Sequence, residues 1–521
     1  MLLLPLYVRK ISAREYGVFS LMMLAMSLIV IVLRMGLNHA FFRQYYETDD
    51  PERRRRIVGS ALVFLVLSSA AAIAVLYPAA PWLSMILLGG DRGRAWLMRL
   101  VLITCFFEVI TLVPESILRA KFKSLRYSAL NIVALAFQLA AISYLVLFVD
   151  ASATGIIVGR LAGTIFEAFI FYIAVRSELS LSFSLVETRA MLAFGSPLVL
   201  SQLLSTLFVI IDRFFVDRYG SEGDVGVYSL ANSVVLLISV LITVPFNQVW
   251  SVMRFSVMNE EGATDYYSRV LTYVAIASMF LALVVAAVAG DGLLLKADRS
   301  YWRASTIIPI LAFSAVFDTA SQVINVGITL RKRTLFSPLI TGLALAVNIG
   351  LNFMLIPRFG PMGASISTLL SFMAFCVFRF WFSNLFFKVE YEWTRVFNTL
   401  TIGGLLILAF YMIDHYRGAE PPTRTLVYSL AFKLLLAFSF PVLLYLAGVF
   451  NKREILRLNQ LASKLRTRPH GGSASPVLAG APAAVAAARG GAAESSTNQR
   501  VQPDPGARDQ DSEAPSRNTT L

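Results

Sequence analysis

The feature that most constrains this chain is a succession of thirteen apolar segments, which extends almost from the first residues to about residue 450. A bilayer-spanning helix needs about 20 apolar residues, and each segment is about that long. Because the hydrocarbon core holds no water, a spanning segment must satisfy its backbone hydrogen bonds internally, so we predict helices. The predicted spans are 17–40, 57–77, 95–118, 127–149, 153–176, 191–216, 226–249, 268–289, 305–330, 335–357, 362–384, 397–414 and 425–450.

The composition agrees with a membrane protein and excludes most soluble enzyme classes. Charged residues make up 15% of the chain and hydrophobic residues 57%, whereas soluble domains carry about 25% charged residues. The net charge of +14 would suit a nucleic-acid binder if the basic residues formed one patch. They lie between apolar segments instead, so we predict no nucleic-acid partner.

Cysteine and histidine residues give no indication of a metal site or a cofactor. Cys105 and Cys376 each lie alone inside an apolar segment, and His39, His415 and His470 are isolated from one another. Metal sites need ligands at short regular spacings, which are absent from this sequence. We therefore predict neither a metal nor a cofactor.

The distribution of positive charge predicts the orientation in the membrane. Lys and Arg residues near span ends are retained on the cytoplasmic side. We count 24 of them in one set of alternate connections together with the segment after the last span, and 13 in the other set. The C-terminus is therefore predicted to be cytoplasmic.

An internal repeat divides the predicted helices into two halves. Residues 7–21 align without a gap to 216–230 at an offset of 209, with Gly17 on Gly226 and Ser12 on Ser221. Later pairs keep similar offsets, with 118–119 on 330–331 at 212 and Gly155 on Gly363 at 208. Each copy holds six spans, so the halves have parallel topology, as in many transporters.

The fold class expected from this pattern is an all-α polytopic membrane protein with four sections. Residues 1–185 form the first half, 186–390 the second half, and 391–450 two extra spans. Residues 451–521 are basic and then rich in Ala, Gly and Pro, which predicts a disordered cytoplasmic tail. In the repeat, residues 1–8 match only the last third of a span, so we expect a start codon upstream and fourteen spans in total.

The residues that open each half carry a resemblance to a known family. Residues 3–21 resemble the opening signature of Wzx-type polysaccharide flippases, in the multidrug/oligosaccharidyl-lipid/polysaccharide exporter superfamily. Asp212-Arg213 with residues 226–231 resembles the signature of their second half. Residues 352–360, followed by 363–364 and 367–368, are similar to a later pattern of the family.

The resemblance implies a function in cell-surface polysaccharide biosynthesis. Such proteins pass a polyprenyl-pyrophosphate-linked oligosaccharide across the bacterial cytoplasmic (inner) membrane and are not enzymes. The implied partners are this lipid-linked oligosaccharide, the membrane lipids, and the polysaccharide polymerase and chain-length machinery.

Arginine residues within the spans are the candidates for contact with the anionic headgroup, since a charge buried in a membrane is costly and usually functional. We assign Arg34, Arg160 and Arg379 to a cationic, substrate-binding cavity, and Lys433 in the last span is a weaker candidate. The alternatives are snorkelling to the interface, which suits Arg379, and an ion pair such as Arg160 with Glu167.

Acidic residues within the spans are the candidates for ion coupling. Glu108, Glu115 and Asp318 are assigned this role, with a salt bridge to a neighbouring arginine as the alternative. Asp212 and Arg213 are adjacent and do not face each other on a helix, so each needs its own partner. We assign this pair a structural or gating role.

Three other functions remain open from the sequence. One is export of cationic drugs by a member of the same superfamily, for which an acidic cavity would be expected. Another is translocation of a peptidoglycan precursor. The third is a membrane glycosyltransferase or polymerase, which would need a larger loop with catalytic residues than this chain offers.

Overall fold

The structure is a computed structural model that describes residues 3–87, 94–331, 333, 335–417 and 422–450. The chain divides into two units, Met1–Asn451 and Lys452–Leu521. The predicted tail at 451–521 lies outside the described residues, and everything below concerns the first unit.

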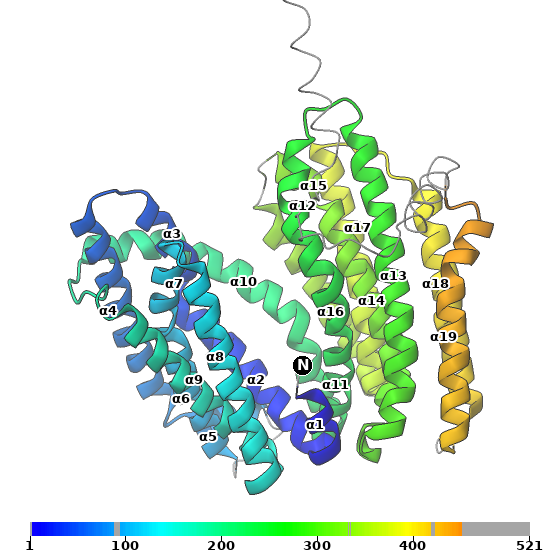
Figure 1. Ribbon diagram of the computed structural model, residues 1–521, viewed down its shortest axis with the longest axis horizontal. Helices are drawn as coiled ribbons and strands as arrows, with labels where there is room; N and C mark the ends of the chain where they lie inside the picture. Colours follow the sequence, from blue (N-terminus) through cyan, green and yellow to red (C-terminus); the bar gives the residue numbers. More distant parts are fainter. Residues whose placement is uncertain (1–2, 88–93, 332, 334, 418–421, 451–521) are drawn as a thin grey trace, which may run out of the picture. The chain divides into compact units, whose positions relative to one another are not determined.

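Every regular element within the described residues is a helix (Figure 1). The α-helices are α1 (Leu4–Lys10), α2 (Ala13–Arg34), α3 (Leu37–Tyr46), α4 (Pro51–Leu76), α5 (Ala80–Leu87), α6 (Ala95–Ile110), α7 (Leu112–Ala120), α8 (Ser124–Tyr144), α9 (Ala153–Val175), α10 (Leu185–Tyr219), α11 (Glu222–Ile238), α12 (Val244–Ser256), α13 (Ala263–Lys296), α14 (Ala304–Ile324), α15 (Val326–Leu330), α16 (Phe336–Phe359), α17 (Pro361–Phe386), α18 (Trp393–Arg417) and α19 (Thr423–Leu446). Two π-helical turns, η1 (Leu145–Val149) and η2 (Ser239–Thr243), and one 3₁₀ turn, η3 (Arg299–Tyr301), complete the set.

Thirteen helical stretches in the described residues are long and apolar enough to cross a membrane, and each overlaps one predicted span. The prediction of an all-α polytopic membrane protein is therefore confirmed. Some of these stretches are interrupted. The stretch Ala13–Tyr46, for example, is broken between α2 and α3, where Met35 and Gly36 both have positive φ.

A second interruption lies between α6 and α7, around Thr111. Pro114 has no backbone N–H, so it cannot donate to the carbonyl of Ile110, four residues earlier. The Tyr172 hydroxyl on α9 donates to that carbonyl at 3.0 Å instead. A neighbouring helix thus satisfies the backbone group that proline leaves open, as membrane helices require.

The helices α1–α9 form a first group and α10–α17 a second group, with corresponding contacts. In the first group α9 packs against α8 and α6, and in the second α17 packs in the same way against α16 and α14. Helix α10 contacts α2, α3 and α4 of the first group as well as α16 and α11 of the second. This correspondence supports the repeat, whose boundaries remain a prediction.

The closest helix crossing between the groups uses the residues of the internal repeat. Ser12 and Ser221 accept hydrogen bonds from backbone N–H groups three residues later and cap α2 and α11. Farther along, a Cβ on Gly17 would lie 1.8 Å from the carbonyl oxygen of Glu222, and one on Gly226 1.7 Å from that of Ala13. Only glycine allows this approach, so the two glycines bring α2 and α11 into backbone contact.

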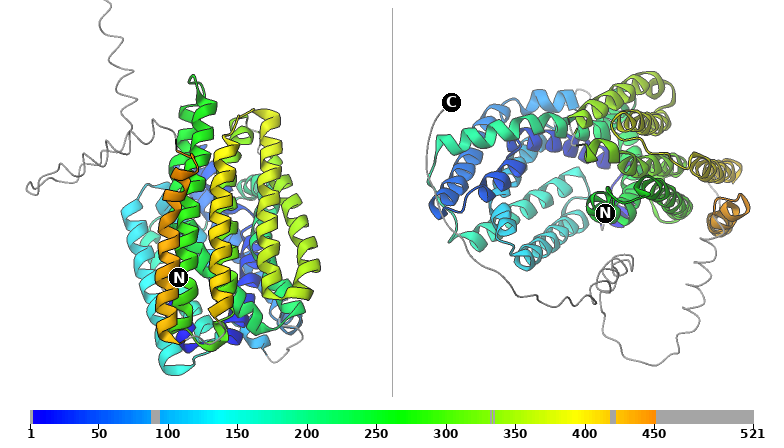
Figure 2. Two further views of the ribbon diagram at one scale, coloured as in Figure 1. Left: turned by 90° about the vertical axis from the view of Figure 1, so that its right-hand side faces the viewer. Right: turned by 90° about the horizontal axis from the view of Figure 1, so that it is seen from above.

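Helices α18 and α19 lie beside α13 (Figures 1 and 2) and are attached to it by buried charges. The Lys433 ammonium on α19 lies 2.9 Å from Asp291 on α13 and 2.6 Å from Asp414 on α18. The Lys433 side chain is only 1% exposed. This residue, the weakest candidate in the sequence for substrate contact, therefore serves to join three helices.

Candidate functional site

Two of the three predicted substrate arginines converge on one carboxylate. Arg34 Nη2 lies 3.8 Å from Glu108 Oε1, and Arg160 Nη2 lies 3.3 Å from Glu108 Oε2. The three side chains are between 29% and 34% exposed, so they are sheltered but reachable. We call Arg34, Glu108 and Arg160 the Glu108 cluster.

Local structure explains why these side chains meet. Arg34 is the last residue of α2, directly before the break at Met35. Arg160 is the eighth residue of α9, and Glu108 lies in the last turn of α6. Arg34 also donates to the backbone carbonyl of Glu108 at 3.2 Å. Three helices of the first group thus supply one residue each.

The remaining predicted site residues, two acidic and one basic, lie outside the Glu108 cluster. Glu115 pairs with Arg119 one turn later, at 3.0 Å. Arg379 lies on α17 of the second group, where it donates to Ser321 at 2.8 Å and stacks over Phe375. Asp318 lies on α14, one turn before Ser321. The structure therefore brings Arg34 and Arg160 together but places Arg379 in the other group.

Asp212 on α10 is the centre of a second buried polar cluster. Its side chain accepts hydrogen bonds from the Tyr228 hydroxyl, the Thr368 hydroxyl and the Asn352 amide, each at 2.7 Å. Asn352 also donates to Asn348 at 3.0 Å. Asp212 is 1% exposed, and no ion pair to it occurs among the described residues. We call these five residues the Asp212 cluster.

The chemistry of the Asp212 cluster suits a proton or a small monovalent cation. A buried carboxylate normally needs a paired positive charge, and here the neighbours from α11, α16 and α17 are all neutral. The Asn352 side-chain oxygen is buried without a hydrogen-bond partner. Hard cations prefer oxygen ligands of this kind. Among the described residues no group of three His, Cys, Asp or Glu side chains gathers as a metal site would.

The sequence contained a signal for this cluster that we interpreted differently. Tyr228, Asn352 and Thr368 all belong to the motifs that carry the family resemblance. These residues, which are far apart in the sequence, all donate hydrogen bonds to the Asp212 carboxylate. Arg213, the next residue, has a buried Nε without a hydrogen-bond partner. As predicted, Asp212 and Arg213 do not pair with each other.

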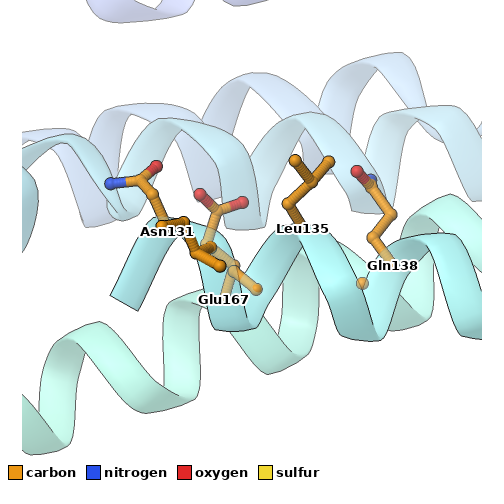
Figure 3. A pocket seen from close by; sticks show the side chains of 7 residues that line it. Asn131, Leu135, Gln138 and Glu167 are labelled. Carbon is orange, nitrogen blue, oxygen red and sulfur yellow. The ribbon is translucent and has the colours of Figure 1, made fainter. Parts of the chain in front are cut away.

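A small cavity lies between α8 and α9 in the first group (Figure 3). It has a volume of about 280 Å³ and is lined by the polar side chains of Asn131, Gln138 and Glu167 together with apolar residues such as Leu135. Glu167 has no ionic partner among the described residues. The predicted alternative of an Arg160–Glu167 pair does not form, since Arg160 turns to Glu108.

Ionic contacts join the two groups where α2 and α11 begin. Glu222 on α11 accepts from Arg14 at 2.7 Å and from Arg94 at 2.9 Å. Arg94 also lies 3.5 Å from Glu15, whose carboxylate accepts from the backbone of Ala153 at 3.0 Å. We call Arg14, Glu15, Arg94 and Glu222 the α2–α11 ionic cluster. These ion pairs link the two groups at the N-terminal ends of α2 and α11.

Comparison with known proteins identifies the family. The sequence profile of the family described as "Polysaccharide biosynthesis protein" matches residues 6–297, which is more than half of the chain. The chain belongs to the polysaccharide biosynthesis protein family. No curated protein matches its sequence.

Solved structures show which fold this polysaccharide biosynthesis protein has. The lipid II flippase MurJ in an inward closed conformation matches with a TM-score of 0.69 and 14% identity, over 85% of this chain and 96% of that one. A multidrug resistance MATE family transporter of the MOP superfamily, inward-facing, matches with a TM-score of 0.60 and 16% identity, over 74% and 93%. The resemblance to Wzx-type flippases is thereby confirmed, and the chain is a multi-pass membrane protein with a transporter fold.

Proposed function

We propose that this polysaccharide biosynthesis protein translocates a polyprenyl-pyrophosphate-linked oligosaccharide across the bacterial cytoplasmic membrane, with its C-terminus in the cytoplasm. The observation that carries this proposal is the convergence of Arg34 and Arg160, from two helices, on one point inside the first group. The family supports a role in polysaccharide biosynthesis, and the fold supports transport. Polymerase and chain-length machinery would act on the translocated product.

The physical difficulty of this reaction lies in the headgroup. A pyrophosphate and several sugars must cross about 30 Å of hydrocarbon, where unpaired charges are costly. Guanidinium groups bind phosphate oxygens through short charge-assisted hydrogen bonds and stay protonated at all relevant pH values. Two of them at one point would hold the diphosphate while the lipid tail stays in the bilayer.

The Asp212 cluster is our proposed site of ion coupling. Its carboxylate lies on α10, which contacts both groups, so protonation or cation binding there changes the charge on the helix that connects them. Glu108, Glu115 and Asp318 remain candidates from the sequence. The ion pairs of Glu108 and Glu115 with arginines make those two residues weaker candidates for this role.

The first experiment is deletion of the gene followed by analysis of lipid-linked intermediates on the cytoplasmic leaflet. Accumulation of a polyprenyl-pyrophosphate oligosaccharide, with loss of one surface polysaccharide, is the expected result. Accumulation of a peptidoglycan precursor would reassign the substrate to the class named for the matched flippase. Unchanged lipid intermediates would contradict the proposal.

Reconstitution tests the arginines directly. Purified protein in vesicles should flip the accumulated lipid, and the double variant Arg34→Gln/Arg160→Gln should lose at least about 100-fold in rate, as expected when two charge-assisted contacts of about 1.5 kcal/mol each are removed. Arg379→Gln, in the second group, tests whether that arginine also contributes. Wild-type flipping by the double variant would contradict the assignment.

One observation favours a second candidate function, the export of organic cations. Glu167 presents a carboxylate without an ionic partner among the described residues, near Asn131 and in a cavity that Gln138 also lines (Figure 3). A positively charged drug would satisfy this carboxylate. If export is the function, the deletion strain should become sensitive to cationic drugs, and Glu167→Gln should not restore resistance.

A further inference from the structure

Glu108 is shared between two guanidinium groups and is held tightly by neither. Its two oxygens face Arg34 at 3.8 Å and Arg160 at 3.3 Å. Charge-assisted N–H···O bonds are usually about 2.7–2.9 Å long, and the Arg53–Glu187 pair in this protein is 2.8 Å. The carboxylate therefore compensates both arginines without fully satisfying either.

Both arginines keep donors that Glu108 does not use. The Nε atoms of Arg34 and Arg160 are buried without a hydrogen-bond partner among the described residues. A buried donor without a partner costs about 1–3 kcal/mol. An anion with more oxygens than a carboxylate, spaced over a larger volume, would satisfy donors that the empty cluster leaves open.

We propose that Glu108 is an internal counter-anion, which occupies the arginine pair in the empty transporter and is exchanged for the diphosphate of the substrate. This inference rests on the proposed function. Without Glu108, the empty protein would hold two unpaired guanidinium groups inside the membrane. With it, the diphosphate competes against a carboxylate, so it binds more weakly and is released more readily on the far side.

The backbone around Glu108 suits such an exchange. Glu108 lies three residues before the interruption at Thr111, where Pro114 removes a helical hydrogen bond and Tyr172 replaces it. Helix ends of this kind can shift more easily than a continuous helix. Arg34 also bonds the Glu108 carbonyl at 3.2 Å, so it stays in place when the carboxylate moves away.

The binding experiment uses the full-length protein in lipid nanodiscs with inorganic pyrophosphate as the probe. Glu108→Gln removes the competing charge while keeping the side-chain shape, and pyrophosphate should bind about fivefold to tenfold more tightly, which is the scale of one partly exposed ion pair. Glu392→Gln is the matched control. Glu392 is 29% exposed and pairs at 2.8 Å with Arg395 in the first turn of α18, away from the Glu108 cluster, so its removal should leave pyrophosphate affinity unchanged.

The transport experiment separates exchange from a merely structural role. Glu108→Gln should flip the lipid-linked oligosaccharide with a lower KM and a lower kcat, because binding improves while release slows. Glu108→Asp keeps the charge and should restore both values toward those of the wild type. A fall in kcat with a rise in KM would mean that Glu108 only positions the arginines, and the inference would be overturned.

The outcomes also distinguish this inference from the proposed function. If Arg34→Gln/Arg160→Gln binds pyrophosphate as well as the wild type, the site of the proposed function is wrong. If the double variant loses pyrophosphate binding and Glu108→Gln shows no gain, the exchange is wrong and the proposed function stands.

Discussion

The α2–α11 ionic cluster makes a sharp prediction about how the two groups separate. An alternating-access movement that opens this end would separate α2 from α11, and Glu222 on α11 carries ion pairs to Arg14 on α2 and to Arg94 at the start of α6. We consider Glu222→Gln, which keeps the shape of the side chain and removes its charge. The variant should shift the equilibrium toward a state in which this end is open.

The magnitude follows from the exposure of each partner. Arg14 is 69% exposed, so its pair with Glu222 contributes at most about 0.5 kcal/mol. Arg94 is 19% exposed and 2.9 Å from Glu222, and a partly buried charge-assisted bond is worth about 1.5 kcal/mol. The sum of about 2 kcal/mol corresponds to a shift of about 30-fold toward the open state.

Alkylation of an introduced cysteine measures this shift. Ser233 on α11 is partly buried, and its hydroxyl lies 3.2 Å from the Tyr16 hydroxyl on α2, so its side chain should become more accessible when the helices part. In a background that lacks Cys105 and Cys376, Ser233→Cys should be alkylated faster when Glu222→Gln is added, by up to about 30-fold, because alkylation from the open state follows the open population. The assay works in nanodiscs and does not depend on membrane orientation.

A matched control removes the same charge elsewhere. Glu47 pairs with Arg43 at 2.7 Å on the surface of α3, and both side chains are about half exposed. Glu47→Gln should leave the alkylation rate within twofold of the background. If Glu222→Gln changes the rate less than threefold, packing rather than charge closes this end, and the reasoning is refuted.

Three further predictions follow from single residues. Gly226→Ala places a methyl group 1.7 Å from a backbone carbonyl oxygen of α2. The alkylation rate of Ser233→Cys should therefore rise by more than it does in Glu222→Gln. An unchanged rate would show that the two helices adjust freely to the methyl group. Asp212→Asn replaces the acceptor of three hydrogen bonds and should lower stability by about 2–4 kcal/mol, seen as a fall in the apparent midpoint of thermal unfolding; an unchanged midpoint would contradict a tightly bonded carboxylate. Two opposing effects act on the pKa of the Glu178 carboxyl. Burial raises this pKa, but the hydrogen bonds and positive charges of Lys121 and Lys123 lower it more, so the pKa lies below its ordinary value. Its stabilisation should therefore be present at neutral pH and disappear as the pH falls through that lowered pKa, so the thermal midpoints of the wild type and Glu178→Gln should differ at pH 7 and converge in acid.

The spans were predictable because each depends on its own apolar residues. The thirteen helical stretches follow from length and hydropathy alone, and the interruption beside Pro114 follows from a missing backbone donor. Neither depends on which helices are neighbours.

The ion pairs were less predictable because they connect different helices. Periodicity places Arg160 and Glu167 on one face of α9, yet Arg160 contacts Glu108, 52 positions earlier in the chain. Lys433 likewise meets Asp291, which is 142 positions away. A helical pattern indicates which face a side chain occupies, whereas the residue opposite is decided by the packing of another helix.

The two halves use equivalent positions for different chemistry. The repeat offset of 209 places Arg34 on Thr243, and the offset of 212 places Glu108 on Ala320, the residue after Thr319. Arg34 contacts Glu108 in the first group, and the hydroxyls of Thr243 and Thr319 lie 2.8 Å apart in the second. The second half therefore brings together residues at or next to the positions that correspond to Arg34 and Glu108.

The third arginine position extends this comparison. At the offset of 208, Arg160 corresponds to Thr368, which donates to Asp212. The second half thus has hydroxyl groups at or next to the three positions where the first has charges, and it carries the buried carboxylate of Asp212 on α10. Since a diphosphate needs cations and a small cation needs oxygens, this difference supports our proposal that the headgroup binds in the first half and the coupling ion in the second. Exchanging Arg160 for threonine should therefore abolish headgroup binding and leave any ion-dependent stabilisation of the protein intact, and loss of both together would contradict this division.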